Sequence, residues 1–174
     1  MASVSIRVAT PEDAEAITRI YMQSAEHHAL LDPERNQVPD PAAICERYRT
    51  GAQHPAGEEG VTLVAEKHGE VLGFLDARLI PPFDPMFRPV TLCFITDVAV
   101  ATDRRREGIG EQLMTAVEQW GSSRGAGLVA LEYLNANTRA ASFYDRLGYR
   151  PKSTVAVKAV ASLQNHVRDD RDRG

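Results

Sequence analysis

Apolar side chains recur every three or four residues in several stretches of the chain, which is the spacing of one helix face. The first of these stretches follows Thr10, Pro11 and Asp13, three residues that suit the cap, the first turn and the capping box of a helix start. The pattern predicts four helices, after Thr10, at 42–49, at 109–120 and within 135–149. Proline- and glycine-rich loops separate the first two helices from their neighbours.

Short apolar runs between the helices have the composition of β-strands. The pattern predicts strands at 3–8, 61–66, 71–80, 91–100, 127–134 and 154–160. The run TLCFITDVAV at 91–100 is apolar at successive positions, which is typical of a central strand covered on both faces. The chain is therefore expected to be an α/β (α+β) protein whose strands gather around two central helices.

Composition places the chain among ordinary globular proteins. It has 174 residues, of which 43% are hydrophobic and 25% charged, so a single domain over residues 1–163 with a polar, flexible tail at 164–174 is expected. A net charge of −4 argues against nucleic acid as a partner. No apolar run is long enough for a membrane span or a secretory leader. Cys45 and Cys93 lie far apart, which favours a reducing cytoplasm and predicts neither a metal site nor a disulfide.

The segment RRREGIG, residues 104–110, lies between the run at 91–100 and the helix at 109–120. A helix start exposes unpaired N–H groups and attracts anions, and glycines allow a phosphate to approach the backbone closely. The segment is also compatible with plain surface charge. A Walker loop is excluded because no Gly-Lys-Ser/Thr follows, and a dinucleotide fingerprint fails because Leu113 stands where a third glycine is required.

Two linked motifs in residues 92–149 resemble the GNAT superfamily of N-acetyltransferases. FITDVAVATDRRREGIG is similar to the family's fourth strand and its Arg/Gln-x-x-Gly-x-Gly/Ala turn, with Arg105, Gly108 and Gly110 at the matching places. LEYLNANTRAASFYDRLGY is similar to the fifth strand and the helix that follows it. The resemblance implies a mixed, mostly antiparallel sheet of six to seven strands, flanked by about four helices, whose fourth and fifth strands splay apart.

The resemblance also implies that acetyl-CoA enters the notch between those two strands as the cosubstrate. Its pantetheine arm would pair with the backbone around Val98, Ala99 and Val100, and Asn137 would touch the same arm. Its pyrophosphate would lie on the turn formed by Arg105, Arg106, Glu107, Gly108, Ile109 and Gly110. The alternative for the strand valines is simple core packing, which is compatible with a backbone role.

Attack of an amine on a thioester needs a neutral amine, a donor for the oxyanion and an acid for the leaving thiolate. By resemblance, a backbone N–H near Val98 serves the oxyanion and Tyr144 is the general acid, although Tyr144 also suits an apolar helix face. Many relatives place a glutamate where this chain has Thr96, which removes the commonest base, and Asp97 could act as the base through water. Other candidates remain open, namely Glu132, Glu26, His27, His28 and a water chain. No metal is expected, because adjacent histidines on a helix face different directions.

The resemblance places the acceptor between residues 24–42 and the loop at 81–90. The second segment carries Phe83, Met86 and Phe87, which suit contact with a ligand, contact with a second subunit, or packing within the loop. The function expected is acetyl transfer from acetyl-CoA to a primary amine, which could belong to a small amine, an amino acid, an antibiotic or a peptide. Alternatives are a non-catalytic CoA-binding module and a nucleotide-binding protein, and a homodimer is possible.

Overall fold

The computed structural model describes residues 3–54, 59–82 and 84–158. Two compact units divide the chain, Met1–Ser142 and Phe143–Gly174, and helix α4 crosses the boundary between them. The elements are β1 (Ser5–Val8), a 3-10 turn (Pro11–Asp13), α1 (Ala14–Leu31), α2 (Pro41–Thr50), β2 (Gly60–Lys67), β3 (Glu70–Ile80), β4 (Thr91–Val100), a 3-10 turn (Thr102–Arg104), α3 (Ile109–Ser123), β5 (Ala126–Leu131) and α4 (Thr138–Arg146). All four predicted helices are therefore present.

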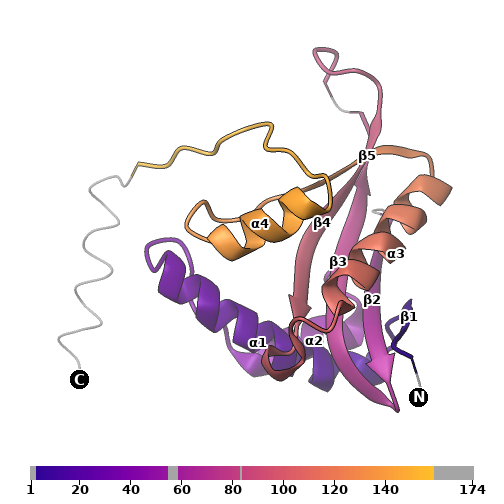
Figure 1. Ribbon diagram of the computed structural model, residues 1–174, viewed down its shortest axis with the longest axis vertical. Helices are drawn as coiled ribbons and strands as arrows, with labels where there is room; N and C mark the ends of the chain where they lie inside the picture. The colour runs from indigo at the N-terminus through magenta and orange to yellow at the C-terminus, as the bar shows by residue number, and fades with distance from the viewer. Residues whose placement is uncertain (1–2, 55–58, 83, 159–174) are drawn as a thin grey trace. The chain divides into compact units, whose positions relative to one another are not determined.

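The described residues form one five-stranded sheet in the order β1-β2-β3-β4-β5, so the expected six to seven strands is wrong for this part of the chain (Figure 1). Pairs β1–β2, β2–β3 and β3–β4 are antiparallel, and β4–β5 is parallel. The strand predicted at 154–160 is not formed over 154–158, which has no regular structure, while 159–160 lie outside the described residues. Alternating apolar residues alone did not make a strand there.

Strands β4 and β5 separate halfway along β4. Their pairing runs from Thr91 opposite Ala126 to Ile95 opposite Leu131, and β4 then continues to Val100 without β5. This explains why β4 is not buried on both faces as its composition suggested: Cys93 and Ile95 are buried, while residues 96–100 remain partly exposed. The pairing ends at Leu131, the last residue of β5, and the expected splay of the two strands beyond it stays a prediction.

Helices cover both faces of the sheet. Val64 and Phe74 belong to a core cluster with Ile17 and Ile20 of α1 and with residues of α2. A side chain at the neighbouring position, Gly73, would point to the opposite face, because side-chain directions alternate along a strand. A Cβ at Gly73 would meet Ile109 and Leu113 of α3 at 3.3 Å, so α3 packs closely on that opposite face.

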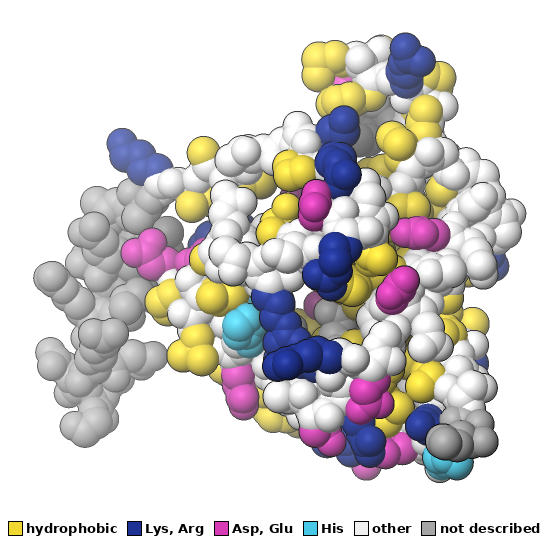
Figure 2. All heavy atoms as spheres, in the orientation of Figure 1, with side chains coloured by type: hydrophobic (Ala, Val, Ile, Leu, Met, Phe, Trp, Pro, Cys, Tyr) yellow, Lys and Arg dark blue, Asp and Glu magenta, His cyan; other side chains and the backbone are white. Residues whose placement is uncertain are grey.

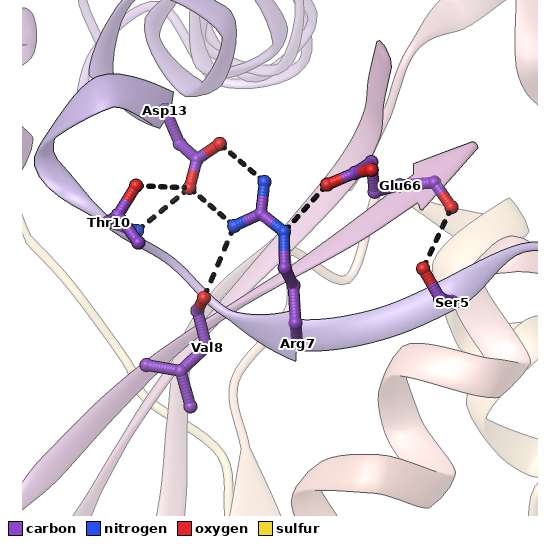
Figure 3. A network of polar contacts seen from close by, with 6 residues as sticks. All are labelled: Ser5, Arg7, Val8, Thr10, Asp13 and Glu66. Atoms are coloured by element: carbon purple, nitrogen blue, oxygen red, sulfur yellow. Dashed lines mark hydrogen bonds and ion pairs between the residues drawn. The ribbon is translucent and has the colours of Figure 1, made fainter. Parts of the chain in front are cut away.

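Arg7 of β1 joins the sheet to the start of α1 (Figure 3). Its two terminal nitrogens donate to both Asp13 carboxylate oxygens at 2.7 and 2.8 Å, and its Nε donates to Glu66 of β2 at 2.6 Å. Asp13 also accepts a bond from the backbone N–H of Thr10 at 2.8 Å, which is one half of the predicted capping box. These bonds, from Arg7 first, lower the pKa of Asp13.

A capped start and a glycine end set the limits of α2. Its N-cap Asp40 accepts a hydrogen bond from Ala42 N–H at 3.1 Å, and it ends at Gly51, whose φ of 76° is left-handed.

Cys45 and Cys93 are free thiols. Among the described residues, no helix combines the length and the apolar character that a membrane crossing requires.

Candidate functional site

The turn before α3 has the backbone conformation expected of an anion-binding site. Gly108 is left-handed at φ 77°, and no side chain caps the helix that begins at Ile109. The first N–H groups of a helix have no acceptor within it, so those of Ile109, Gly110 and Glu111 remain available. Arg106 also has a positive φ of 70°, which is uncommon for a residue with a side chain and is concentrated at functional sites.

Arg105 of this turn lies near enough to Arg139 of α4 for the two charges to act on each other. Burial lowers the pKa of Arg105, and the neighbouring charge of Arg139 lowers it further. Two close guanidinium groups repel each other, and an anion between them removes that cost. Arg104 is instead engaged by Glu70 at 3.3 Å and Asp103 at 3.6 Å. Figure 2 shows Lys and Arg side chains grouped on the face where this turn lies in Figure 1. Arg139 was not predicted from the sequence, although it lies two residues after Asn137.

The free half of β4 lies next to this turn along the chain. Val98, Ala99 and Val100 pair with β3 on one side and have no strand partner on the other within the described residues. Arg105 Nε reaches the carbonyl of Val100 at 3.4 Å, which links the turn to the strand end. An extended ligand chain can therefore find unpaired backbone here, as in strand addition.

A β-bulge interrupts β4 at Thr96. The β3–β4 register shifts between Asp76 and Ala77, so that Asp76 lies opposite Asp97 while Ala77 lies opposite Ile95. Bulges re-aim side chains and are common next to active sites. Thr96, which stands where many relatives have glutamate, donates a 3.4 Å bond to the Asp76 carbonyl.

A cavity of about 150 Å³ opens beside Asp97. Its lining comes from α1, from the segment before α2 and from β4: Tyr21, Ser24, Ala25, His28, Asn36, Gln37, Pro39 and Asp97. The predicted acceptor segment 24–42 supplies most of this lining. The described residues of the loop at 81–90 supply none of it, and Met86 in this loop is 80% exposed, which does not fit packing within the loop. Phe83 lies outside the described residues.

Asp97 and His28 are the two titratable groups that face the cavity and can accept a proton at neutral pH. Burial first, and the charge of Asp76 second, raise the pKa of Asp97 to about 7. Burial, and the neighbouring His27, lower the pKa of His28, so that imidazole is neutral at pH 7. A base whose pKa lies near the working pH is well suited to proton transfer.

The other base candidates lie elsewhere. Glu26, His27 and Glu132 are exposed and do not line the cavity. The rings of His27 and His28 are 6.1 Å apart. Among the described residues, no group of three or more His, Cys, Asp or Glu could hold a metal ion.

Asn137 and Tyr144, the two site residues predicted in the last motif, lie at and on α4. Asn137 Oδ1 accepts a bond from Ala140 N–H at 3.1 Å and so caps the helix, while its amide N–H₂ group is left for another acceptor. Tyr144 is buried, and its ring contacts Phe143 and Tyr149 edge to face within the second unit. Both packing and a chemical role are compatible with this placement.

Sequence reasoning missed a polar cluster beneath the cavity. Asp76 is 1% exposed and accepts a hydrogen bond from Tyr48 Oη at 2.5 Å. The Arg47 guanidinium lies 5.1 Å from the ring centres of both Tyr48 and Tyr21. A signal was available, because Asp76 is a lone acid inside the otherwise apolar run VLGFLDARLI. A buried charged group needs partners, so a lone acid at this position indicates polar groups packed against it.

The unpaired strand end, the left-handed glycine and the arginine pair together fit the extended arm and the phosphates of acetyl-CoA. The residues that form these three features come from one contiguous stretch of chain and from Arg139. Most of these residues were predicted from the sequence to act together. In the structure they follow one another along the chain from β4 into the first turn of α3.

Comparison with known proteins agrees with this geometry. The chain is 27% identical over 146 residues to an uncharacterized N-acetyltransferase, YhfO, of Bacillus subtilis, covering 84% of this chain and 89% of that protein. It is 24% identical over 94 residues to an aminoglycoside N(6')-acetyltransferase type 1 of Salmonella typhimurium, covering 54% of this chain and 65% of that protein.

Solved structures share the fold. A tetramutant of the BH1408 protein from Bacillus halodurans superposes with a TM-score of 0.80 at 24% identity, covering 90% of this chain and 99% of that one. The aminoglycoside N-acetyltransferase AAC(6')-Iy, solved with CoA, gives a TM-score of 0.72 at 19% identity, covering 92% and 97%. The model of the acetyltransferase (GNAT) family matches residues 16–149. The chain therefore belongs to the acetyltransferase (GNAT) family.

Proposed function

We propose that this protein transfers the acetyl group of acetyl-CoA directly to a primary amine bound in the cavity beside Asp97. The observation that carries the proposal is the bulge in β4, which lines the cavity with Asp97 just before the free strand end. Asp97, the acid–base group, is therefore followed directly in β4 by residues 98–100, the segment able to hold a thioester arm.

In this mechanism the arm lies along residues 98–100 and the phosphates lie on the turn 105–110. Family membership supports acetyl-CoA as the cosubstrate. Extra support comes from the first N–H groups of α3 and from Arg105 and Arg139, which supply positive potential where the phosphates would lie. Glycine at 108 adopts the left-handed conformation without strain.

The amine enters as an ammonium ion with a pKa of roughly 10.4 and must lose a proton before it attacks. Asp97 accepts that proton, directly or through one water, and its raised pKa matches a working pH near 7. The amine nitrogen then forms a bond to the thioester carbonyl carbon, while a backbone N–H near Val98 stabilises the oxyanion. The carbon–sulfur bond breaks, the amine's second proton is released to solvent, and Tyr144 protonates the departing thiolate.

Cavity size and lining guide the choice of acceptor. A volume of about 150 Å³ is below the roughly 300–1,000 Å³ of pockets that enclose a whole drug-sized ligand, which suits the amine-bearing end of a molecule. Ser24, Asn36 and Gln37 offer neutral hydrogen-bonding groups there, and Asp97 offers a carboxylate for a cation. A small polar amine, or one ring of an aminoglycoside as in the Salmonella relative, therefore fits better than a large apolar acceptor.

The test has a binding step and a turnover step. Calorimetry should detect acetyl-CoA binding that ATP and NAD do not compete with. Thiol release from acetyl-CoA should then be followed across small amines, amino acids, aminoglycosides and peptides. Asp97→Asn should abolish turnover while keeping acetyl-CoA binding, and the exposed Asp103→Asn should leave turnover unchanged. Binding without turnover on a broad panel would instead support a non-catalytic CoA-binding module, and absence of binding would contradict the proposal.

A further inference from the structure

Two carboxylates face each other across strands β3 and β4. Asp76 and Asp97 are directly opposite in the register, so their side chains share the face of the sheet that α1 and α2 cover. Opposite Cβ atoms in an antiparallel pair lie about 4.5–5.5 Å apart. Asp76 is fully buried, whereas Asp97 lines the cavity.

Such a pair cannot ionise twice without a large cost. Like charges at this separation in a poorly solvated site raise the proton affinity of one member, and the pair then titrates as a unit. Arg47 is the one cation of α2 that acts on both carboxylates. Two carboxylates and one guanidinium carry a net charge of −1, and a single shared proton makes the cluster neutral.

Hydrogen bonding to Asp76 influences how the two carboxylates share this proton. Tyr48 Oη donates to Asp76 Oδ2 at 2.5 Å, and burial raises the pKa of Tyr48, which keeps its proton. A donor stabilises the ionised form of the carboxylate that accepts it. Within the described residues no donor reaches the carboxylate of Asp97. Burial also raises the pKa of Asp76, while hydrogen bonds from Tyr48 and Thr62 lower it, so the two carboxylates compete for one proton and Asp97 is the member that faces the cavity.

The remaining groups around the pair are few. Arg47 donates to Tyr48 Oη at 3.3 Å and holds it in place from α2. Tyr21 and His28 face the pair from α1, and burial raises the pKa of Tyr21 and lowers that of His28, so both are neutral at pH 7. His54, in the loop after α2, also acts on Asp76. Among the described residues, Arg47 is the one cation that lowers the pKa of Asp97.

We propose that Asp76, held by the hydroxyl of Tyr48, is a positioning residue that sets the proton affinity of Asp97. Asp76 does not face the cavity and acts only through its neighbour. The use of this coupling in catalysis rests on the proposed role of Asp97 as base. The coupling itself belongs to the folded protein and can be measured without any acceptor.

The experiment follows the Cγ signals of ¹³C-labelled aspartate in the full chain by NMR as a function of pH. The Asp97 signal is assigned by its loss in Asp97→Asn, and the Asp76 signal by its loss in Asp76→Asn. In the wild type, the Asp97 signal should titrate near pH 7. In Asp76→Asn it should titrate at least one pH unit lower, a tenfold or greater fall in proton affinity. An Asp97 midpoint within 0.3 units of the wild type would overturn the proposal.

Tyr48→Phe provides a second variant that keeps both carboxylates and the ring that packs on Phe74. Without the hydroxyl, Asp76 keeps the bond from Thr62 but loses the one from Tyr48, so the shared proton should shift towards Asp76. The step near neutrality should then appear in the Asp76 signal, and the Asp97 midpoint should fall. Unchanged signals for both would overturn the proposal. Asp103→Asn, at an exposed carboxylate, is the matched control and should change neither midpoint.

Activity adds an independent readout once an acceptor is in hand. The acidic limb of the pH profile of kcat/KM should shift to lower pH in Asp76→Asn by the same amount as the Asp97 midpoint, with acetyl-CoA binding unchanged. A limb that stays in place while the NMR midpoint moves would confirm the coupling and contradict the proposed role of Asp97. The failure of the two proposals is therefore distinguishable.

Discussion

Replacing Gly73 by alanine tests whether the close approach of α3 to the sheet positions the cosubstrate site. A Cβ at this position would lie 2.9 Å from the carbonyl oxygen of Ala99 and 3.3 Å from side-chain carbons of Ile109 and Leu113. The first of these atoms is backbone, so relief requires movement of β4 or α3. Ala99 and Ile109 both belong to the residues proposed to hold acetyl-CoA.

The magnitude follows from the size of the clash. Adding one methyl group to a packed interior costs about 1–3 kcal/mol when the surroundings must shift. For a chain of this length, 1 kcal/mol lowers Tm by about 2–4 °C, so a loss of about 2–12 °C is expected. Because the shift falls on Ala99 and Ile109, acetyl-CoA binding should weaken by about tenfold, which corresponds to about 1.4 kcal/mol.

Urea unfolding and calorimetric titration with acetyl-CoA measure the two effects. Gly121→Ala is the matched control, since its Cβ would meet Cys93 Cβ at 2.8 Å on the same face but far along α3 from the turn. Its steric clash should lower the free energy of unfolding, but alanine's higher helix propensity offsets roughly 1 kcal/mol of that loss. Its affinity for acetyl-CoA should be unchanged. A Gly73→Ala protein with wild-type stability and affinity would refute the reasoning.

Three further predictions concern single side chains. Asp13→Asn should lower the free energy of unfolding at pH 7 by about 2 kcal/mol. The contribution of the Asp13 carboxylate is complete above the ordinary carboxyl pKa near 4 and is lost as pH falls through the lowered pKa of the folded state. The urea midpoints of the wild type and the variant should therefore converge in acid. Asp40→Ala should cost about 1 kcal/mol by urea unfolding, because α2 loses its cap, and a loss near zero would show that the cap is dispensable. Tyr144→Phe should lower kcat at least about 100-fold with acetyl-CoA affinity kept, and equal kcat values would remove Tyr144 as the acid.

Local signals in the sequence predicted most of the fold. Pro11 and Asp13 mark the start of the first helix, Gly148 follows the last, and the apolar spacing at 109–120 matches the buried face of α3. The strand predicted at 154–160 failed over its described part because alternation of Val and Ala shows compatibility with a sheet but supplies no partner.

The candidate site was predicted only where one motif carries it. The turn 105–110 and Asp97 follow from contiguous residues, and the family resemblance supplied their roles. The partnership of Asp76, Tyr48 and Arg47 depends on register across two strands and on the packing of α2, which are long-range properties that spacing along one chain does not encode. Arg139 was missed for the same reason.

The measurement that tests the central claim most directly compares two quantities in one reaction: the thiol released from acetyl-CoA and the N-acetylated amine detected by mass spectrometry. Equal amounts of both are expected with the wild-type protein, and neither above background with Asp97→Asn. Thiol release without an acetylated amine, or full acetylation by Asp97→Asn, would contradict direct transfer to an amine with Asp97 as its base.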